Sequence, residues 1–176
     1  MPRVFNGCDA KAEGRFAVVV ARYNESITGK LLEGALETFL ARGLSDTDID
    51  VAWVPGAWEL PLVAQRFAES GAYRGVCCLG AVIRGDTSHD EHINRQVSLS
   101  LGQIALATGT PVMFGVLTCH SLEQAIHRSG GKMGNKGAEC AEAALEMADV
   151  MAQLLVPQAA PDAAGVGADD IQLAGS

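Results

Sequence analysis

The feature that most constrains this fold is an apolar run followed at once by a glycine turn and polar residues. Residues 76–83 (VCCLGAVI) carry no charge, whereas residues 84–92 (RGDTSHDEH) are almost entirely polar. Such a run is typical of a parallel strand buried on both faces. Ser88 and Glu91 have capping-box spacing, which predicts a helix beginning near His89. A strand, a glycine turn and a helix N-terminus together favour anion binding, because free backbone N–H groups point outward there.

The remaining chain alternates short apolar runs with segments of helical periodicity. Such alternation predicts a parallel sheet covered on both faces. We therefore predict an α/β fold, a three-layer α/β/α sandwich with a flavodoxin-like four-stranded parallel sheet. The other strands are expected at 16–21, 49–54 and 112–118. The other helices are expected from a cap at Asn24 or Ser26 to Gly43, from about 60 to Gly71, from Ser121 to Arg128, and from 137 to Pro157. Ser121 and Gln124 have the spacing of a capping box.

A length of 176 residues indicates one domain with flanking segments. Residues 1–14 are polar apart from Val4-Phe5, so we expect a short N-terminal edge strand or arm. The folded domain is expected at 15–156. Residues 157–176 are rich in Ala, Gly, Pro and Asp and predict a disordered tail; a recruitment peptide within Asp169–Leu173 is the alternative.

Charge and cysteine content exclude several classes of protein. A net charge of −8 without a basic stripe argues against nucleic-acid binding. No apolar stretch is long enough to span a bilayer, and the first residues lack a hydrophobic signal core. The five cysteines contain no Cys-x-x-Cys pair, so we expect reduced thiols in a cytoplasmic protein.

Three polar turns are expected to converge at one edge of the sheet. They are residues 22–24, 55–59 and 84–89, each directly after a strand. Ligands of such folds bind beyond the carboxyl ends of the strands. His89 would place a group that titrates near neutrality beside a bound anion. An equally good interpretation is that His89 is only a surface or capping residue. His89 and His92 also resemble a metal-ligand pair, but no third ligand stands out, and a solvated helix face explains them more simply.

Each other candidate also has a simpler structural interpretation. Trp58 could belong to the core, and Glu59 could be a favourable first-turn charge. Tyr23 could stack on a planar ring or cover the end of the sheet. Arg128 could hold a phosphate or satisfy the helix dipole. The loop 130–137 is not a Walker P-loop, because the Gly-Lys-Ser/Thr ending is missing.

Five sequence blocks together resemble the 6,7-dimethyl-8-ribityllumazine synthase family. The similarity runs from about Phe16 to Val156, in the family's order and spacing. The blocks are ARYN (21–24), VPGAWELP (54–61), GAVIRGDTSH (80–89), PVMFGVLT (111–118) and LEQAIHRSGGKMGNKG (122–137).

The resemblance implies a transferase of riboflavin biosynthesis that needs no cofactor. Such enzymes condense 5-amino-6-(D-ribitylamino)uracil with L-3,4-dihydroxy-2-butanone 4-phosphate to give 6,7-dimethyl-8-ribityllumazine, phosphate and water. His89 would transfer protons. The ribitylaminouracil would be bound by Tyr23, Ala57, Trp58, Glu59, Ala81, Val82, Ile83 and, from a neighbouring subunit, Phe114; the butanone phosphate would be bound by Asp86, Thr87, Arg128 and Lys136.

The chain departs from the family's usual pattern at several of these positions. Asp90 stands where an aromatic residue is usual, and Asp86 where a small residue or sometimes a glutamate is usual. A carboxylate beside a phosphate is unfavourable unless it points away. Glu139 replaces a common aspartate and is expected to pair with Arg128; Tyr23 and Trp58 replace residues that are commonly phenylalanine.

The family assembles as pentamers, some of which close into icosahedral shells. The short turn GGKMGNKG resembles that of shell-forming members, so we expect a shell, with riboflavin synthase as a possible cargo. The alternatives are a non-catalytic lumazine or flavin binder and a flavodoxin-like interaction module. The archaeal type of riboflavin synthase is a related enzyme, and it is expected to lack the phosphate site that GDTSH and Arg128 would form here.

Overall fold

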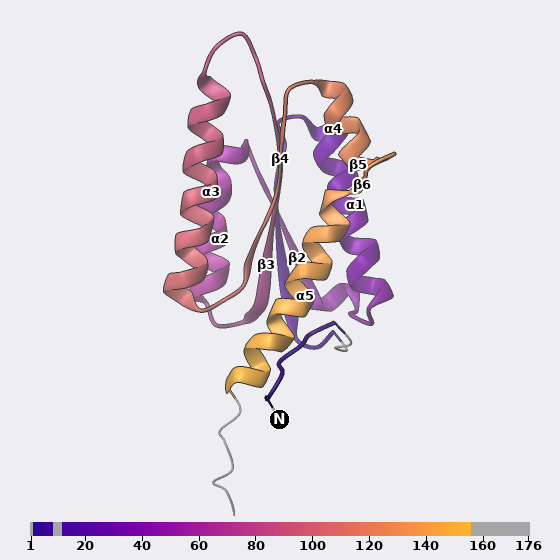
Figure 1. Cartoon of the computed structure of the whole chain (residues 1–176), viewed down its shortest axis with the longest axis vertical. Coiled ribbons are helices and arrows are strands. Elements are labelled where there is room, and N and C mark those ends of the chain that lie inside the picture. Colours follow the sequence, from indigo (N-terminus) through magenta and orange to yellow (C-terminus); the bar gives the residue numbers. More distant parts are fainter. Residues whose placement is uncertain (1, 9–11, 156–176) are drawn as a thin grey trace, which may run out of the picture.

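The computed structural model describes residues 2–8 and 12–155, which form one parallel sheet between two helical layers (Figure 1). The strand order is β2-β1-β3-β4, and every neighbouring pair is parallel. This confirms the predicted three-layer, flavodoxin-like fold. The strands are β1 (Arg15–Ala21), β2 (Ile49–Val54), β3 (Tyr73–Ile83) and β4 (Val112–Cys119).

The helices lie on the two faces of the sheet, as Figure 1 shows from the edge. One layer contains α1 (Glu25–Ala41), α4 (Leu122–Arg128) and α5 (Lys136–Leu155); the other contains α2 (Leu60–Glu69) and α3 (His89–Thr108). Two 3-10 helices, η1 (Asp46–Asp48) and η2 (Ala57–Glu59), flank β2, and a small hairpin, β5 (Ser129–Gly131) and β6 (Gly134–Asn135), joins α4 to α5.

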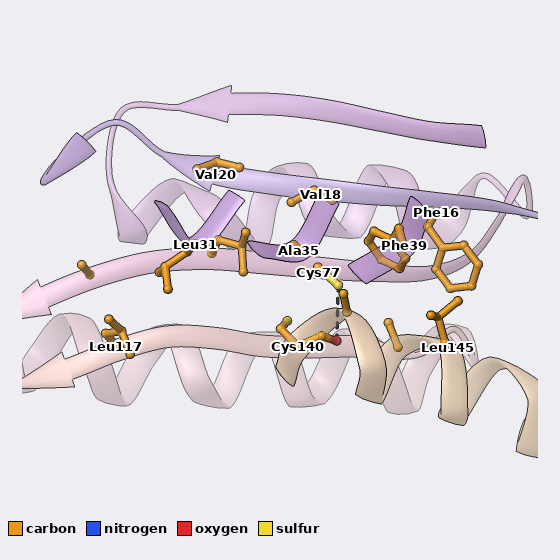
Figure 2. Packing of buried hydrophobic residues seen from close by; sticks show 14 of the residues in the cluster. Phe16, Val18, Val20, Leu31, Ala35, Phe39, Cys77, Leu117, Cys140 and Leu145 are labelled. Carbon is orange, nitrogen blue, oxygen red and sulfur yellow. Dashed lines mark hydrogen bonds between the residues drawn. The ribbon is translucent and has the colours of Figure 1, made fainter. Parts of the chain in front are cut away.

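Alternation along the central strands builds a core on each face. In β1, Phe16 and Val18 point toward α1 and α5, whereas Ala17 and Val19 point toward α2 and α3. Figure 2 shows the first of these cores, in which the Sγ of Cys77 approaches the carbonyl oxygen of Cys140 at 3.5 Å. Because both faces are covered, the central strands read as continuous apolar runs.

Helices α1 and α5 meet at a backbone contact that has no room for a side chain. A Cβ added at Gly137 would lie 1.8 Å from the carbonyl oxygen of Leu31. Asn135 fixes the junction: its Oδ1 accepts the Gly137 N–H at 2.8 Å, and its Nδ2 donates to the carbonyl of Lys30 at 2.8 Å. The side chain of Asn135 therefore caps α5 and ties it to α1.

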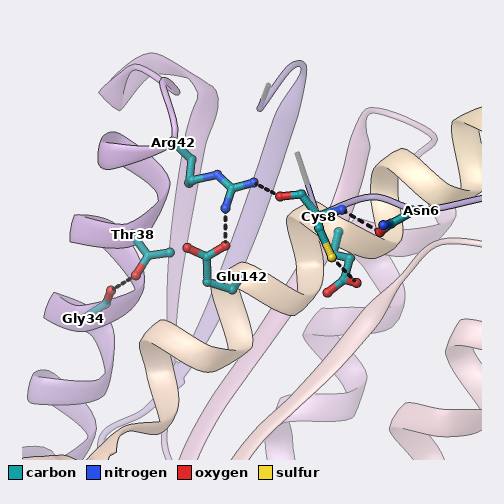
Figure 3. Close-up of polar contacts among 7 residues, drawn as sticks. Asn6, Cys8, Gly34, Thr38, Arg42 and Glu142 are labelled. Atoms are coloured by element: carbon teal, nitrogen blue, oxygen red, sulfur yellow. Dashed lines mark hydrogen bonds and ion pairs between the residues drawn. The ribbon is translucent and has the colours of Figure 1, made fainter. Parts of the chain in front are cut away.

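The N-terminal residues 2–8 form an arm and contain no strand. The Asn6 N–H donates to Oε1 of Gln153 at 3.3 Å, and Nε2 of Gln153 donates back to the Asn6 carbonyl at 2.7 Å. Arg42 bridges the Cys8 carbonyl at 3.1 Å and Glu142 at 2.8 Å (Figure 3). The arm thus lies along α5 and reaches the end of α1.

Several predicted helix ends are confirmed, and the predicted side-chain cap at Ser88 is wrong. Gly43 has φ 103°, and the Ser121 Oγ accepts the Gln124 N–H at 3.2 Å, as predicted. Ser88 makes no capping bond, although α3 does begin at His89. Its φ and ψ of −77° and 11° lie outside the extended region that orients an N-cap side chain. Pro157 and the predicted tail lie outside the described residues.

Candidate functional site

A cavity of about 530 Å³ opens at the carboxyl edge of the sheet. Its size is in the range of small-molecule sites. The three polar turns that follow β1, β2 and β3 all contribute to its wall, which confirms the predicted convergence. Its lining residues are Tyr23, Pro55, Gly56, Ala57, Trp58, Glu59, Ala81, Val82, Ile83, Gly85, Thr87, His89, Asp90 and Ile93.

The back wall of the cavity comes from a difference in strand length. The pairing of β1 with β3 ends at Val20 and Leu79, whereas β3 stays paired with β4 as far as Ile83. The last three residues of β3 therefore face the cavity where β1 has already turned away. Their backbone polar groups on that side are placed to contact a ligand.

Asn24 fastens this edge and does not cap α1 with its side chain. It has φ 62° and is the only non-glycine residue with positive φ in the described ranges. Its Nδ2 donates to the carbonyl oxygen of Ala81 at 2.8 Å. Asparagine tolerates the left-handed conformation better than most residues, so Asn24 can both turn the chain and bridge β1 to β3.

The floor of the cavity depends on Gly80. A Cβ there would lie 3.2 Å from Cδ1 of Leu60, 3.4 Å from Cγ1 of Val116 and 3.5 Å from Cβ of Ala57. The missing side chain lets η2 and the start of α2 approach β3 closely. This approach brings Trp58 and Glu59 to the cavity.

The turn after β2 provides one oriented carboxylate and one aromatic ring. Oε2 of Glu59 accepts the Gly56 N–H at 2.9 Å, which fixes the side chain and leaves Oε1 available. Trp58 remains 56% exposed, and Tyr23, on the same cavity, remains 72% exposed. Two large rings with accessible faces suit the stacking of a planar ligand.

The turn after β3 brings polar groups to the N-terminus of α3. Gly85, Thr87 and His89 line the cavity, and the His89 N–H lies 3.5 Å from Oγ1 of Thr87. Helix α3 is 20 residues long, and its free N–H groups and dipole favour an anion at this end. His89 is exposed and therefore accessible to a ligand.

Four of the predicted site residues lie outside the cavity lining. Asp86 is exposed beside it, and Phe114 lies in the middle of β4 with 39% of its surface exposed. Arg128 is the exposed last residue of α4, and its charge opposes the rise in the pKa of the Cys119 thiol that burial causes. Lys136 is at the start of α5.

The predicted pairing of Glu139 with Arg128 is wrong. Oε2 of Glu139 instead contacts Nζ of Lys136 at 2.8 Å. The two residues are three positions apart in α5, a spacing that brings side chains together within one helix.

The cavity wall is acidic. Its carboxylates come from Glu59 and Asp90, and no lysine or arginine is among its described lining residues. In residues 2–8 and 12–155, no cluster of three or more His, Cys, Asp or Glu side chains could hold a metal ion. Over the same part of the chain, no helix is both long and apolar enough to cross a membrane.

Some lining residues carried weak signals in the sequence. Pro55 and Gly56 were recognisable as the end of a strand, and Ile93 as a core position of the following helix. Asp90 was recognisable as a departure from the family pattern, and only the structure brings it to the cavity.

Fold and site together define a flavodoxin-like α/β protein with a ligand-sized cavity at the carboxyl edge of its sheet. The family model described as 6,7-dimethyl-8-ribityllumazine synthase matches residues 13–152, which span β1 to most of α5. The chain belongs to this family. Membership supports a role in riboflavin biosynthesis, a transferase activity on small molecules and an oligomeric assembly.

Proposed function

We propose that the protein condenses 5-amino-6-(D-ribitylamino)uracil with L-3,4-dihydroxy-2-butanone 4-phosphate, giving 6,7-dimethyl-8-ribityllumazine, phosphate and water. The observation that carries the proposal is the single cavity shared by the aromatic turns and the His89 helix start. It can hold two small molecules side by side, and proximity supplies much of the rate enhancement for such a condensation. The proposed reaction uses no metal or redox cofactor.

The ribitylaminouracil is proposed to occupy the side formed by the turns after β1 and β2. Tyr23 stacks on the pyrimidine ring, and the backbone of residues 81–83 binds its polar edge. Ala57 and Trp58 line the ribityl chain, and Oε1 of Glu59 accepts hydrogen bonds from its hydroxyls. This assignment is supported by the exposed rings and by the Gly56 contact that fixes Glu59.

His89 is proposed to transfer the protons. The ring amine attacks the ketone to give an imine and one water, phosphate is then eliminated, and ring closure releases a second water. Each step moves a proton near neutral pH, which suits imidazole. The exposure of His89 and its place in the cavity wall support this role.

The phosphate is proposed to bind at the turn before α3, through Thr87 and the backbone of Asp86, with Arg128 and Lys136 as its cationic partners. The cavity of one chain has no cation in its described lining, and a charged partner strengthens the hydrogen bonds to a phosphate. We therefore propose that a neighbouring copy supplies Arg128, Lys136 and Phe114. The copies would form a pentamer that closes into an icosahedral shell, with riboflavin synthase as a possible cargo.

We further propose the domain organisation and the compartment. Residues 15–156 would form the synthase domain, with 1–14 as an arm and 157–176 as a tail. All five cysteines are free thiols, four of them buried, which suits a reducing cytoplasm.

The test is a mixing assay without metal. Lumazine absorbance and phosphate release should rise together, and His89→Ala should lower the rate by about 10²- to 10⁴-fold, the usual contribution of general acid–base catalysis. His92→Ala is the matched control, because His92 is exposed on the same helix turn and does not line the cavity. Lumazine binding with a rate no better than the spontaneous reaction would instead support the non-catalytic binder.

A further inference from the structure

Asp90 lies on the face of α3 that should be apolar. The buried stripe of this helix contains Ile93, Val97, Leu101 and Ile104, and Asp90 continues it at the spacing of three and four residues. Asp90 is accordingly half-buried and lines the cavity. A carboxylate at this position is not explained as part of a solvated helix face.

Its neighbours in the first turn of α3 behave differently. Glu91 and His92 are exposed and do not line the cavity. Both carboxylates of this turn interact favourably with the helix dipole, so the dipole does not account for the orientation of Asp90. Within the described part of the chain, Asp90 forms no hydrogen bond or ion pair with another side chain, so its carboxylate is available to a ligand in the cavity that it lines.

The two proposed substrates differ in how they would meet such a carboxylate. The ribitylaminouracil is uncharged and carries amine, ring N–H and hydroxyl donors. The butanone phosphate is an anion, and its phosphate has acceptor oxygens. Like charges a few ångströms apart repel more strongly in a partly enclosed site than in bulk water. Asp90 therefore favours one substrate and disfavours the other on its side of the cavity.

We infer that Asp90 is a specificity residue that accepts a hydrogen bond from the ribitylaminouracil and keeps the phosphate of the second substrate out of that place, so that it binds at the turn before α3. The inference rests on the proposed function and deepens it. Each substrate then has one favoured place, which reduces binding of the butanone phosphate in the wrong position.

The test compares Asp90→Asn with Glu91→Gln in the full-length protein. Both changes remove one negative charge from the same helix turn, but only Asp90→Asn alters the cavity wall. Asp90→Asn should raise the KM for the ribitylaminouracil about five- to tenfold, because a hydrogen bond loses its charged acceptor. The KM for the butanone phosphate should fall or stay constant, and Glu91→Gln should change neither.

A binding measurement makes the result independent of turnover. Fluorescence titration with 6,7-dimethyl-8-ribityllumazine should show weaker binding to Asp90→Asn than to Glu91→Gln, whereas calorimetry with inorganic phosphate should show equal or tighter binding. Equal behaviour of the two variants, or weaker phosphate binding by Asp90→Asn, would overturn the inference. If the unaltered protein binds lumazine but makes none, the proposed reaction fails and the comparison still decides the role of Asp90. Absence of lumazine binding would overturn both.

Discussion

Gly137 shows how one missing side chain joins two helices. Its backbone lies outside the left-handed region, so the glycine is needed for space and not for conformation. The carbonyl of Leu31 occupies the place where a Cβ would stand, and Asn135 holds both helices at that distance. A backbone oxygen cannot move aside as a flexible side chain can.

We expect Gly137→Ala to lower the free energy of unfolding by about 3 kcal/mol, at the upper end of the usual cost of overpacking. Urea unfolding would measure it. Gly29→Ala, in α1, is the control, since nothing lies within 4 Å of its added Cβ. It should raise stability by about 0.5–1 kcal/mol through helix propensity. Equal stability of the two variants would contradict the importance of the contact.

At the level of elements, helix α5 makes contacts with other segments near both of its ends. Its first turn is fixed to α1 by Asn135, and its last turns hold the N-terminal arm through Gln153. Arg74, at the start of β3, donates to the carbonyl of Ala148 in the same helix at 3.0 Å. The arm therefore lies at the amino edge of the sheet, opposite the cavity.

Gln153→Ala should release the arm without unfolding the domain. The change removes both hydrogen bonds to Asn6, which are exposed and contribute little to global stability. Limited proteolysis should cut near residue 6 faster, while the free energy of unfolding changes by less than about 0.5 kcal/mol. Gln65→Ala, which removes only a bond within α2, serves as the control. Unchanged cleavage would show that other contacts hold the arm.

The sequence predicted the sheet well because strands that are buried on both faces are recognisable as runs of apolar residues. All four strands begin and end within a few residues of the apolar runs, and the largest difference is at β3, which begins at Tyr73. The Ser88 cap failed because spacing alone does not specify the backbone angles of the cap residue. Convergence of the three turns followed from topology. The separation of Arg128 and Lys136 from the cavity did not, because it depends on the packing of whole helices. The separation of Phe114 was expected, because the family resemblance assigns this residue to a neighbouring subunit.

At the scale of the whole molecule, the buried thiols couple stability to pH. Contact with Cys140, and then burial, raise the pKa of the Cys77 thiol well above its usual value, and burial does the same for Cys78. Above about pH 8.5 the unfolded chain releases these protons while the folded chain keeps them. The unfolded state then binds fewer protons, so stability falls as pH rises.

We therefore expect the free energy of unfolding to decline above about pH 9, under reducing conditions. A hydrogen bond to Asp50, with some burial, raises the pKa of Tyr73, which adds to the decline at higher pH. Denaturant unfolding at several pH values would measure the slope. Cys78→Ala should make the slope shallower, whatever its effect on stability at neutral pH. An equal slope in this variant would contradict the assignment.

The proposed sharing of residues between copies predicts complementation. His89→Ala and Arg128→Ala should each be inactive alone. A site would take His89 from one chain and Arg128 from the next. Refolding the two variants together should therefore restore about a quarter of the activity of the unaltered protein, because about one site in four would combine an intact His89 with an intact Arg128. The activity of each sample would be measured from lumazine absorbance. No recovery in a mixed oligomer would place Arg128 in the same site as its own chain's His89.

The crowded surroundings of Gly80 decide where this cavity can be altered by design. Leu60, Val116 and Ala57 leave little space beneath the strand, so a residue much larger than glycine there would displace the segment that carries Trp58. A pocket for a bulkier ring must therefore be carved from its rim, at Tyr23, Trp58 and Asp90, which border open space. Libraries that vary the rim and keep the floor constant should yield more folded proteins than libraries that vary both.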